Sequence, residues 1–222
     1  MDDGRVWRRI GALSGILALV FSVGGFALIG AADLAVAPDA STEEIAEKLR
    51  DGNESLALVG VYVDTIGSLL FLLFVAYLWS QLRTREASTE WLATVALVAA
   101  VATIVAGMGD KAAYYAIFTR VDEGIDADVA AGLYATASGF FVLFGIFGGL
   151  FALAASLAAR RTAALPGWLG WAGIGVGLAG IATGIEGETA QLAFPLFALW
   201  LVAVSVALLR RSGGPARSEP PP

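Results

Sequence analysis

Six long apolar stretches constrain the fold of this chain more than any other feature of its sequence. A helix needs about 20 apolar residues to cross the ~30 Å hydrocarbon layer of a bilayer. The stretches cover residues 10–32, 56–80, 91–108 with a possible extension to 118, 129–157, 167–185 and 189–209. Their apolar residues are continuous and lack the alternation of membrane-spanning strands. The sequence therefore predicts an all-α, polytopic transmembrane helix bundle with six spans.

The composition agrees with a membrane protein and removes many kinds of chemistry. Of the 222 residues, 58% are hydrophobic and only 15% are charged, and the mean hydropathy is +0.75, beyond the usual range of soluble domains. The absence of cysteine and histidine excludes disulfides, thiolate catalysis and histidine-based metal, haem or proton-transfer sites. No catalytic constellation is visible, so we expect a non-enzymatic protein without a cofactor or a metal site.

The distribution of basic residues predicts the orientation in the membrane. Four basic residues fall on one side of the predicted spans, and ten fall on the other. The ten are Arg5, Arg8, Arg9, Arg83, Arg85, Arg160, Arg161, Arg210, Arg211 and Arg217. Because cytoplasmic loops carry the excess of Lys and Arg, we expect both termini in the cytoplasm. The preference for arginine over lysine further suggests a bacterial protein of the cytoplasmic membrane.

We expect one transmembrane domain over residues 1–211 and a disordered cytoplasmic tail over residues 212–222, which are rich in glycine and proline. The first apolar stretch is longer than the 7–15 residues of a signal peptide, so we interpret it as a span.

A short amphipathic helix is predicted in the first outer loop, residues 33–55, lying on the outer rim. Ser41 and Glu44 have the spacing of a capping box. Glu44 and Lys48 form an i, i+4 pair, and Gly52 can end the helix. The apolar face of this helix comprises Ile45 and Leu49.

Glycines in the fifth predicted span have the spacing of close helix packing. The pairs Gly173 with Gly177 and Gly180 with Gly184 fit the small-xxx-small pattern. Gly175, Gly177 and Gly180 also match a dinucleotide-binding fingerprint, which requires a preceding strand that a membrane span lacks. We therefore predict that this span is a central, closely packed helix. In the sixth span, Pro195 predicts a structural kink rather than a gating hinge.

Five ionisable residues lie within or against the predicted spans: Asp64, Asp110, Lys111, Glu186 and Glu188. At 1.5 Å per residue, Asp64 lies about 28 Å from Arg83 and Asp110 about 30 Å from Glu90 along straight helices. The carboxylates therefore share one depth, toward the outer leaflet. Charges in hydrocarbon are costly and often functional. An ion pair of structural character, with Lys111 neutralising Asp64, is favoured over a substrate or proton site, and both remain open.

The whole chain resembles the bacterial family of six-helix membrane proteins known as domain of unknown function 4386. The resemblance rests on residues 9–13 (RIGAL), 53–56 (NESL) with 63–67 (VDTIG), and 165–170 (LPGWLG). It implies the six-helix architecture and a place for Asp64 in the second span, and it implies no particular activity.

Three functions remain open at this point. The leading one is a polytopic membrane protein without enzymatic activity, and the alternative is a transporter of a small solute or ion, coupled to protons. The third is an accessory or scaffold subunit that binds another membrane protein or a second copy of itself. In each case the bilayer is the expected partner, nucleic acid is not, and a substrate is not identified. A water-filled cavity reaching Asp64 would be the observation that best distinguishes these functions.

Overall fold

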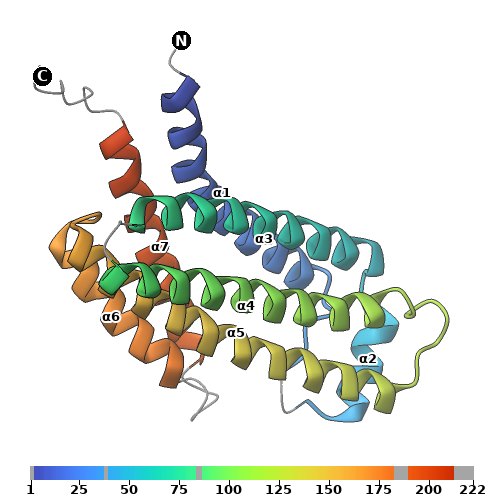
Figure 1. The fold of residues 1–222 in the computed structure, drawn as a ribbon. Coiled ribbons are helices and arrows are strands. Elements are labelled where there is room, and N and C mark those ends of the chain that lie inside the picture. Colours follow the sequence, from blue (N-terminus) through green and yellow to red (C-terminus); the bar gives the residue numbers. More distant parts are fainter. Residues whose placement is uncertain (1–2, 38–39, 84–86, 183–189, 213–222) are drawn as a thin grey trace, which may run out of the picture.

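The chain folds into helices alone in the part that the structure describes. A computed structural model describes residues 3–37, 40–83, 87–182 and 190–212. These ranges contain seven helices and no strand (Figure 1). The helices are α1 (Asp3–Ala31), α2 (Thr42–Asp51), α3 (Glu54–Leu82), α4 (Ala87–Phe118), α5 (Ala127–Thr162), α6 (Gly167–Ala182) and α7 (Ala190–Ser212).

Five helices are long and apolar enough to cross a bilayer, which makes the chain a multi-pass membrane protein. They are α1, α3, α4, α5 and α7, each with a window of high hydropathy. The helix α6 is equally apolar but has 16 residues, which span only about 24 Å. The sequence predicted this span to extend to residue 185, and residues 183–185 lie outside the described part of the chain.

The six apolar helices follow one another around a closed ring. Each of α1, α3, α4, α5 and α6 packs against the apolar helix that follows it in the chain, and α7 packs back against α1. The helix α5 also contacts α3 and α7 across the ring. This arrangement leaves most helices with an inner face toward the bundle and an outer face with exposed apolar side chains, as lipid requires.

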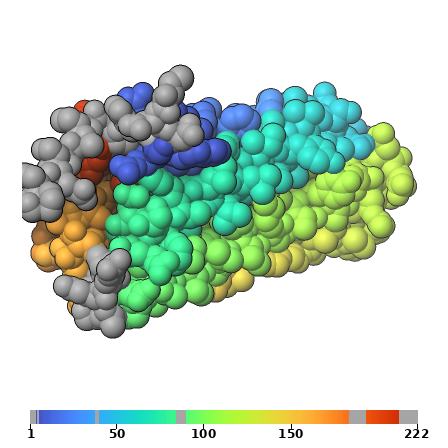
Figure 2. Space-filling view, turned by 45° about the horizontal axis from the view of Figure 1, so that its top comes forward, coloured from blue at the N-terminus to red at the C-terminus, as the bar shows by residue number. Residues whose placement is uncertain are grey.

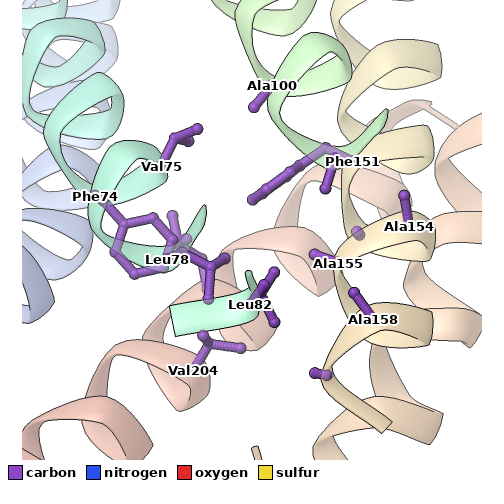
Figure 3. Packing of buried hydrophobic residues seen from close by; sticks show 14 of the residues in the cluster. Phe74, Val75, Leu78, Leu82, Ala100, Phe151, Ala154, Ala155, Ala158 and Val204 are labelled. Atoms are coloured by element: carbon purple, nitrogen blue, oxygen red, sulfur yellow. The ribbon is translucent and has the colours of Figure 1, made fainter. Parts of the chain in front are cut away.

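Large side chains from α3 meet small ones from α5 in the main core. Figure 3 shows Phe74, Leu78 and Leu82 of α3 turned toward Phe151 and Ala155 of α5. The α5 face is rich in buried alanines, which include Ala152, Ala154, Ala155, Ala158 and Ala159. Small residues allow helices to approach closely where lipid supplies no hydrophobic driving force.

The glycine-rich helix α6 is peripheral, so the prediction of a central position was wrong. Among the described helices, only α5 and α7 pack extensively against it. Trp168, Trp171 and Leu178 are exposed on its outer face. The buried glycines fall on one face of the helix, because spacings of three and four residues repeat with the helical turn. High glycine content therefore reflects one close interface rather than burial on all sides.

The short helix of the first loop is confirmed, and its surroundings differ from the prediction. The Glu44 backbone N–H donates to Ser41 Oγ at 3.2 Å, which caps the start of α2. Ile45 and Leu49 are buried against the bundle rather than on a lipid rim. Lys48 Nζ pairs with Asp33 Oδ1 at 2.7 Å instead of with Glu44, and this hydrogen bond raises the pKa of Lys48.

The start of α1 and the ends of α3, α5 and α7 lie at one end of the bundle (Figure 1), and described arginines such as Arg83, Arg160 and Arg211 lie at these helix ends. Arg160 lies over the ring of Trp171, 3.6 Å from its centroid. Arg211 donates to the carbonyl groups of Ala163 and Ala164. Arg85 and Arg217 lie outside the described residues. The opposite end of the elongated molecule holds the start of α3 and the α4–α5 connection (Figure 2).

Candidate functional site

The helix α4 places two of the predicted polar residues inside the bundle. It runs without interruption to Phe118, along the possible extension considered from sequence. Asp110 and Lys111 therefore lie two turns before its end rather than at a helix terminus. Successive residues of a helix point in directions about 100° apart, so Asp110 and Lys111 reach different neighbours.

Lys111 forms an ion pair with Asp64 of α3. The Nζ atom lies 2.8 Å from Asp64 Oδ2, and the side chains are 11% and 5% exposed. The same Nζ also donates to the Gly107 carbonyl at 3.1 Å. The pair thus connects α3 and α4 within the apolar part of the bundle.

Glycines on α1 and α3 allow the two helices to pack closely around Asp64. Gly60 and Gly67 lie one turn before and one turn after Asp64, on the same face of α3. A Cβ atom added to Gly25 of α1 would lie 2.6 Å from Asp64 Cβ, which no real side chain tolerates. A Cβ on Gly67 would lie 2.9 Å from the Ala18 carbonyl oxygen. The α1 and α3 backbones therefore approach closely at the depth of Asp64.

Asp110 is buried and has no partner in the described part of the chain. It is 7% exposed, and the ammonium group of Lys111 is bonded to Asp64. No described side chain or N–H group forms an ion pair or hydrogen bond with the Asp110 carboxyl group. If all three groups are ionised, the cluster of Asp64, Asp110 and Lys111 carries one negative charge in excess.

The three residues line a cavity of about 70 Å³ at the centre of the ring. Five helices contribute to its wall, namely α1, α3, α4, α5 and α7. Three hydroxyl side chains, those of Ser22, Ser68 and Thr103, add to the polar part of the lining. A water needs roughly 10–15 Å³ of such space and two or more polar partners. The cavity therefore has room for several waters or one small group.

Phenylalanines form much of the apolar part of the wall. Phe141 and Phe144 of α5 are stacked with centroids 6.2 Å apart, and Phe144 lies 6.4 Å from Phe194 of α7. Phe197 of α7 contacts Phe71 of α3 at 6.2 Å. Four of these rings also border a smaller hollow of about 20 Å³ between α5, α6 and α7. The lining of the cavity thus combines a polar part with an apolar part that is rich in aromatic rings.

The other predicted residues have different places. Glu186, Glu188 and Gly184 lie outside the described residues. Pro195 is exposed within α7, which continues as a helix across it. Gly177 and Gly180 of α6 pack against the Gly149 region of α5, and a Cβ on Gly177 would lie 2.8 Å from the Gly149 carbonyl oxygen. A Cβ on Gly173 would collide with the indole of Trp200.

Sequence analysis missed the aromatic wall and the close α1–α3 contact at Asp64. The phenylalanines are spread over α3, α5 and α7, and their common direction depends on how each helix is rotated. Gly60 and Gly67 did carry a signal, because they flank Asp64 at helical spacing and so mark a face that packs closely on another helix.

Comparison with models of protein families, with curated proteins and with solved structures found no match. The resemblance to domain of unknown function 4386 therefore stays a prediction, and the candidate site stands on its geometry.

Proposed function

We propose that this chain is a six-span, non-enzymatic protein of the bacterial cytoplasmic membrane that transports a small solute or ion, coupled to protons. Its binding site is the central cavity, and both termini face the cytoplasm. The observation that supports transport most is the contact of this cavity with three ionisable side chains, Asp64, Asp110 and Lys111. Ionisable groups within membrane spans commonly mark ion or substrate pathways.

A purely structural role accounts for only part of the cluster. The pair of Asp64 and Lys111 explains why each tolerates burial, since the two charges neutralise each other at 2.8 Å. It leaves the burial of Asp110 only partly explained, because this carboxyl group is 7% exposed and the ammonium group that attracts it is bonded to Asp64. An unpaired buried polar group is costly, and a proton or a cationic ligand removes that cost.

The position of the cavity also favours transport over a scaffold function. It lies inside the ring of helices, between α1, α3, α4, α5 and α7, and not on the outer face where another membrane protein would bind. Transport by alternating access would require these five helices to move so that the cavity opens first to one side and then to the other.

The proposal is tested by filling the cavity. Gly107 of α4 lines it, and an added Cβ would lie 3.4 Å from Phe144 Cδ2 and 3.6 Å from Lys111 Nζ, so the backbone accepts a side chain. Gly107→Leu then occupies the cavity. The matched control is Gly139→Leu, because a Cβ on Gly139 of α5 meets nothing within 4 Å.

Each protein is purified, checked for folding, reconstituted into liposomes and offered a pooled set of cationic, zwitterionic, neutral and anionic solutes with and without a pH gradient. Accumulated solutes are identified by mass spectrometry. We expect at least one solute to accumulate with the wild type and with Gly139→Leu, and not with Gly107→Leu. Accumulation no greater than in protein-free liposomes contradicts transport, and equal accumulation by folded Gly107→Leu contradicts the cavity as its route.

A further inference from the structure

We infer that the central cavity binds a small monovalent alkylammonium ion, with its charged group at Asp110 and its alkyl groups against the phenylalanine wall. This inference deepens the proposed function by naming the class of ligand that the cavity takes. It depends on the cavity as a binding site and not on movement of the ligand across the membrane.

The charge of the cavity selects a single positive charge. The ammonium of Lys111 is held between Asp64 and the Gly107 carbonyl, so it is not available to Asp110. Among the described residues, the buried Asp110 carboxylate therefore has no bonded counter-ion. A monovalent cation restores neutrality, whereas an anion adds to the negative charge and a neutral molecule leaves it uncompensated.

The aromatic wall favours an organic cation over a divalent metal ion. Divalent metal ions require six or more oxygen ligands or several retained waters, and most of this lining is hydrocarbon. The faces of aromatic rings attract alkylammonium groups, and cages of such rings bind quaternary ammonium ions. Phe144 and the ammonium of Lys111 both lie close to Gly107, so the aromatic and charged parts of the lining adjoin.

The volume limits the size of the ligand. An apolar cavity of about 150 Å³ accepts benzene, and the present cavity of about 70 Å³ is roughly half as large. The fit is therefore to a few heavy atoms, such as methylammonium or trimethylammonium. A protonated amine also donates a charge-assisted hydrogen bond to the Asp110 carboxylate.

Protons should compete with this ligand. The other titratable side chains near Asp110 in the described chain are Asp64 on α3, Lys111 and Tyr114 on α4, and Tyr134 on α5. The described cavity-facing residues of α1 and α7 carry none. Since Asp64 is bonded to Lys111, protonation of Asp110 removes the excess charge. Affinity for the cation should then decrease as the pH falls.

The test is a titration of the purified protein in detergent by calorimetry. Trimethylammonium is compared with tert-butanol, a neutral molecule of similar shape, and with pivalate, an anion. We expect binding of trimethylammonium alone, weakening at acidic pH. Asp110→Asn should reduce the affinity about tenfold or more, because a hydrogen bond to a charged group contributes roughly 1.5–3 kcal/mol. Asp128→Asn, on the exposed start of α5, is the matched control.

A second variant keeps the test decisive if Asp110→Asn does not fold. Phe144→Leu preserves an apolar side chain but removes the ring, and it should weaken trimethylammonium binding, whereas Phe140→Leu, outside the cavity lining, should not. Equal binding of tert-butanol or pivalate, no binding of trimethylammonium, or full affinity in a folded Asp110→Asn protein overturns the inference. Transport is contradicted separately, by the absence of solute accumulation in liposomes.

Discussion

Asp64 and Asp110 are two carboxyl groups at one depth with different surroundings. Asp64 lies in a close α1–α3 contact and pairs with Lys111. Asp110 lines the same cavity without a partner among the described residues. Removing charge from the first should disturb the structure, whereas removing it from the second should disturb ligand or proton binding. Variants of the two residues can therefore be compared in the same measurements of stability and of binding.

The ion pair is tested by a double-mutant cycle. Asp64→Asn removes the carboxylate bonded to Lys111 at 2.8 Å and leaves Asp110 as the remaining, unbonded carboxylate of the cluster, which should destabilise the protein by up to roughly 3–5 kcal/mol. Adding Lys111→Met removes the ammonium group that has lost its bonded partner and should recover much of the loss. Thermal unfolding in detergent measures both effects. Equal stability of the single and the double variant would show that the pair contributes nothing to folding.

Sequence alone could place these three residues together because depth along a helix follows from its fixed rise. It favoured the pairing of Lys111 with Asp64, but it could not show that Asp110 has no bonded partner among the described residues. That outcome depends on the rotation of α4 about its axis, since adjacent residues point about 100° apart. The aromatic wall was missed for the same reason, because Phe71, Phe144 and Phe197 come from three helices whose relative rotation no local pattern specifies.

At the scale of whole elements, the α5–α6 interface depends on backbone contact. A Cβ on Gly149 would lie 2.7 Å from the Gly177 carbonyl oxygen, and a Cβ on Gly180 would lie 2.8 Å from Gly149 Cα. The sequence predicted the close contact from the glycine spacing. It did not predict the peripheral position of α6, because glycine content indicates how closely one neighbouring helix approaches and not how many helices surround it.

Gly177→Leu should force the α5 and α6 backbones apart. Overpacking of this kind costs about 1–3 kcal/mol or more where the obstacle is backbone, so the unfolding temperature in detergent should fall. Gly175→Leu is the control, since a Cβ on Gly175 meets nothing within 4 Å. Equal unfolding temperatures for the two variants would rule out a contribution of this interface to stability.

The docking of α2 is the second prediction at this scale. Leu49 is 8% exposed and packs in the cluster with Ile45 and Leu34. Truncating a buried leucine to alanine typically costs roughly 2–5 kcal/mol. Hydrogen exchange of the α2 amides should therefore accelerate more than tenfold in Leu49→Ala and remain unchanged in Arg50→Ala, whose side chain is exposed. Unchanged exchange in Leu49→Ala would mean that other contacts hold α2.

For the whole molecule, the open question is orientation. Ten of the fourteen basic residues are predicted on one side of the membrane. Those of the ten that the structure describes, such as Arg83 and Arg160, belong to helix ends at the end of the bundle where α1 starts and α7 ends (Figure 1). Hydropathy predicted the helical bundle, and the charge pattern predicted which end faces the cytoplasm, because the bilayer acts directly on apolar and on charged side chains. The order of helices around the ring depends on side-chain fit, which no such pattern encodes.

The native chain has no cysteine, so single cysteines report orientation cleanly. We expect a membrane-impermeant thiol reagent, applied to intact cells, to label a cysteine at Ser41 but not one at Ser88 or Ser212. Permeabilised cells provide the control, in which all three sites should react. Labelling of Ser88 or Ser212 without Ser41 in intact cells would invert the proposed topology.

The closure of the ring by α7 against α1 has a consequence for biosynthesis. The helices that carry Asp64 and Lys111 enter the membrane early, and the ion pair requires only α3 and α4. Phe194 and Phe197 belong to α7, which leaves the ribosome after the other described helices. A nascent chain that has not yet inserted α7 therefore holds its charges in a half-built bundle, open on one side to lipid. We expect a chain that stalls before residue 190 to be a substrate for membrane proteases, because that side of the bundle stays uncovered until α7 inserts.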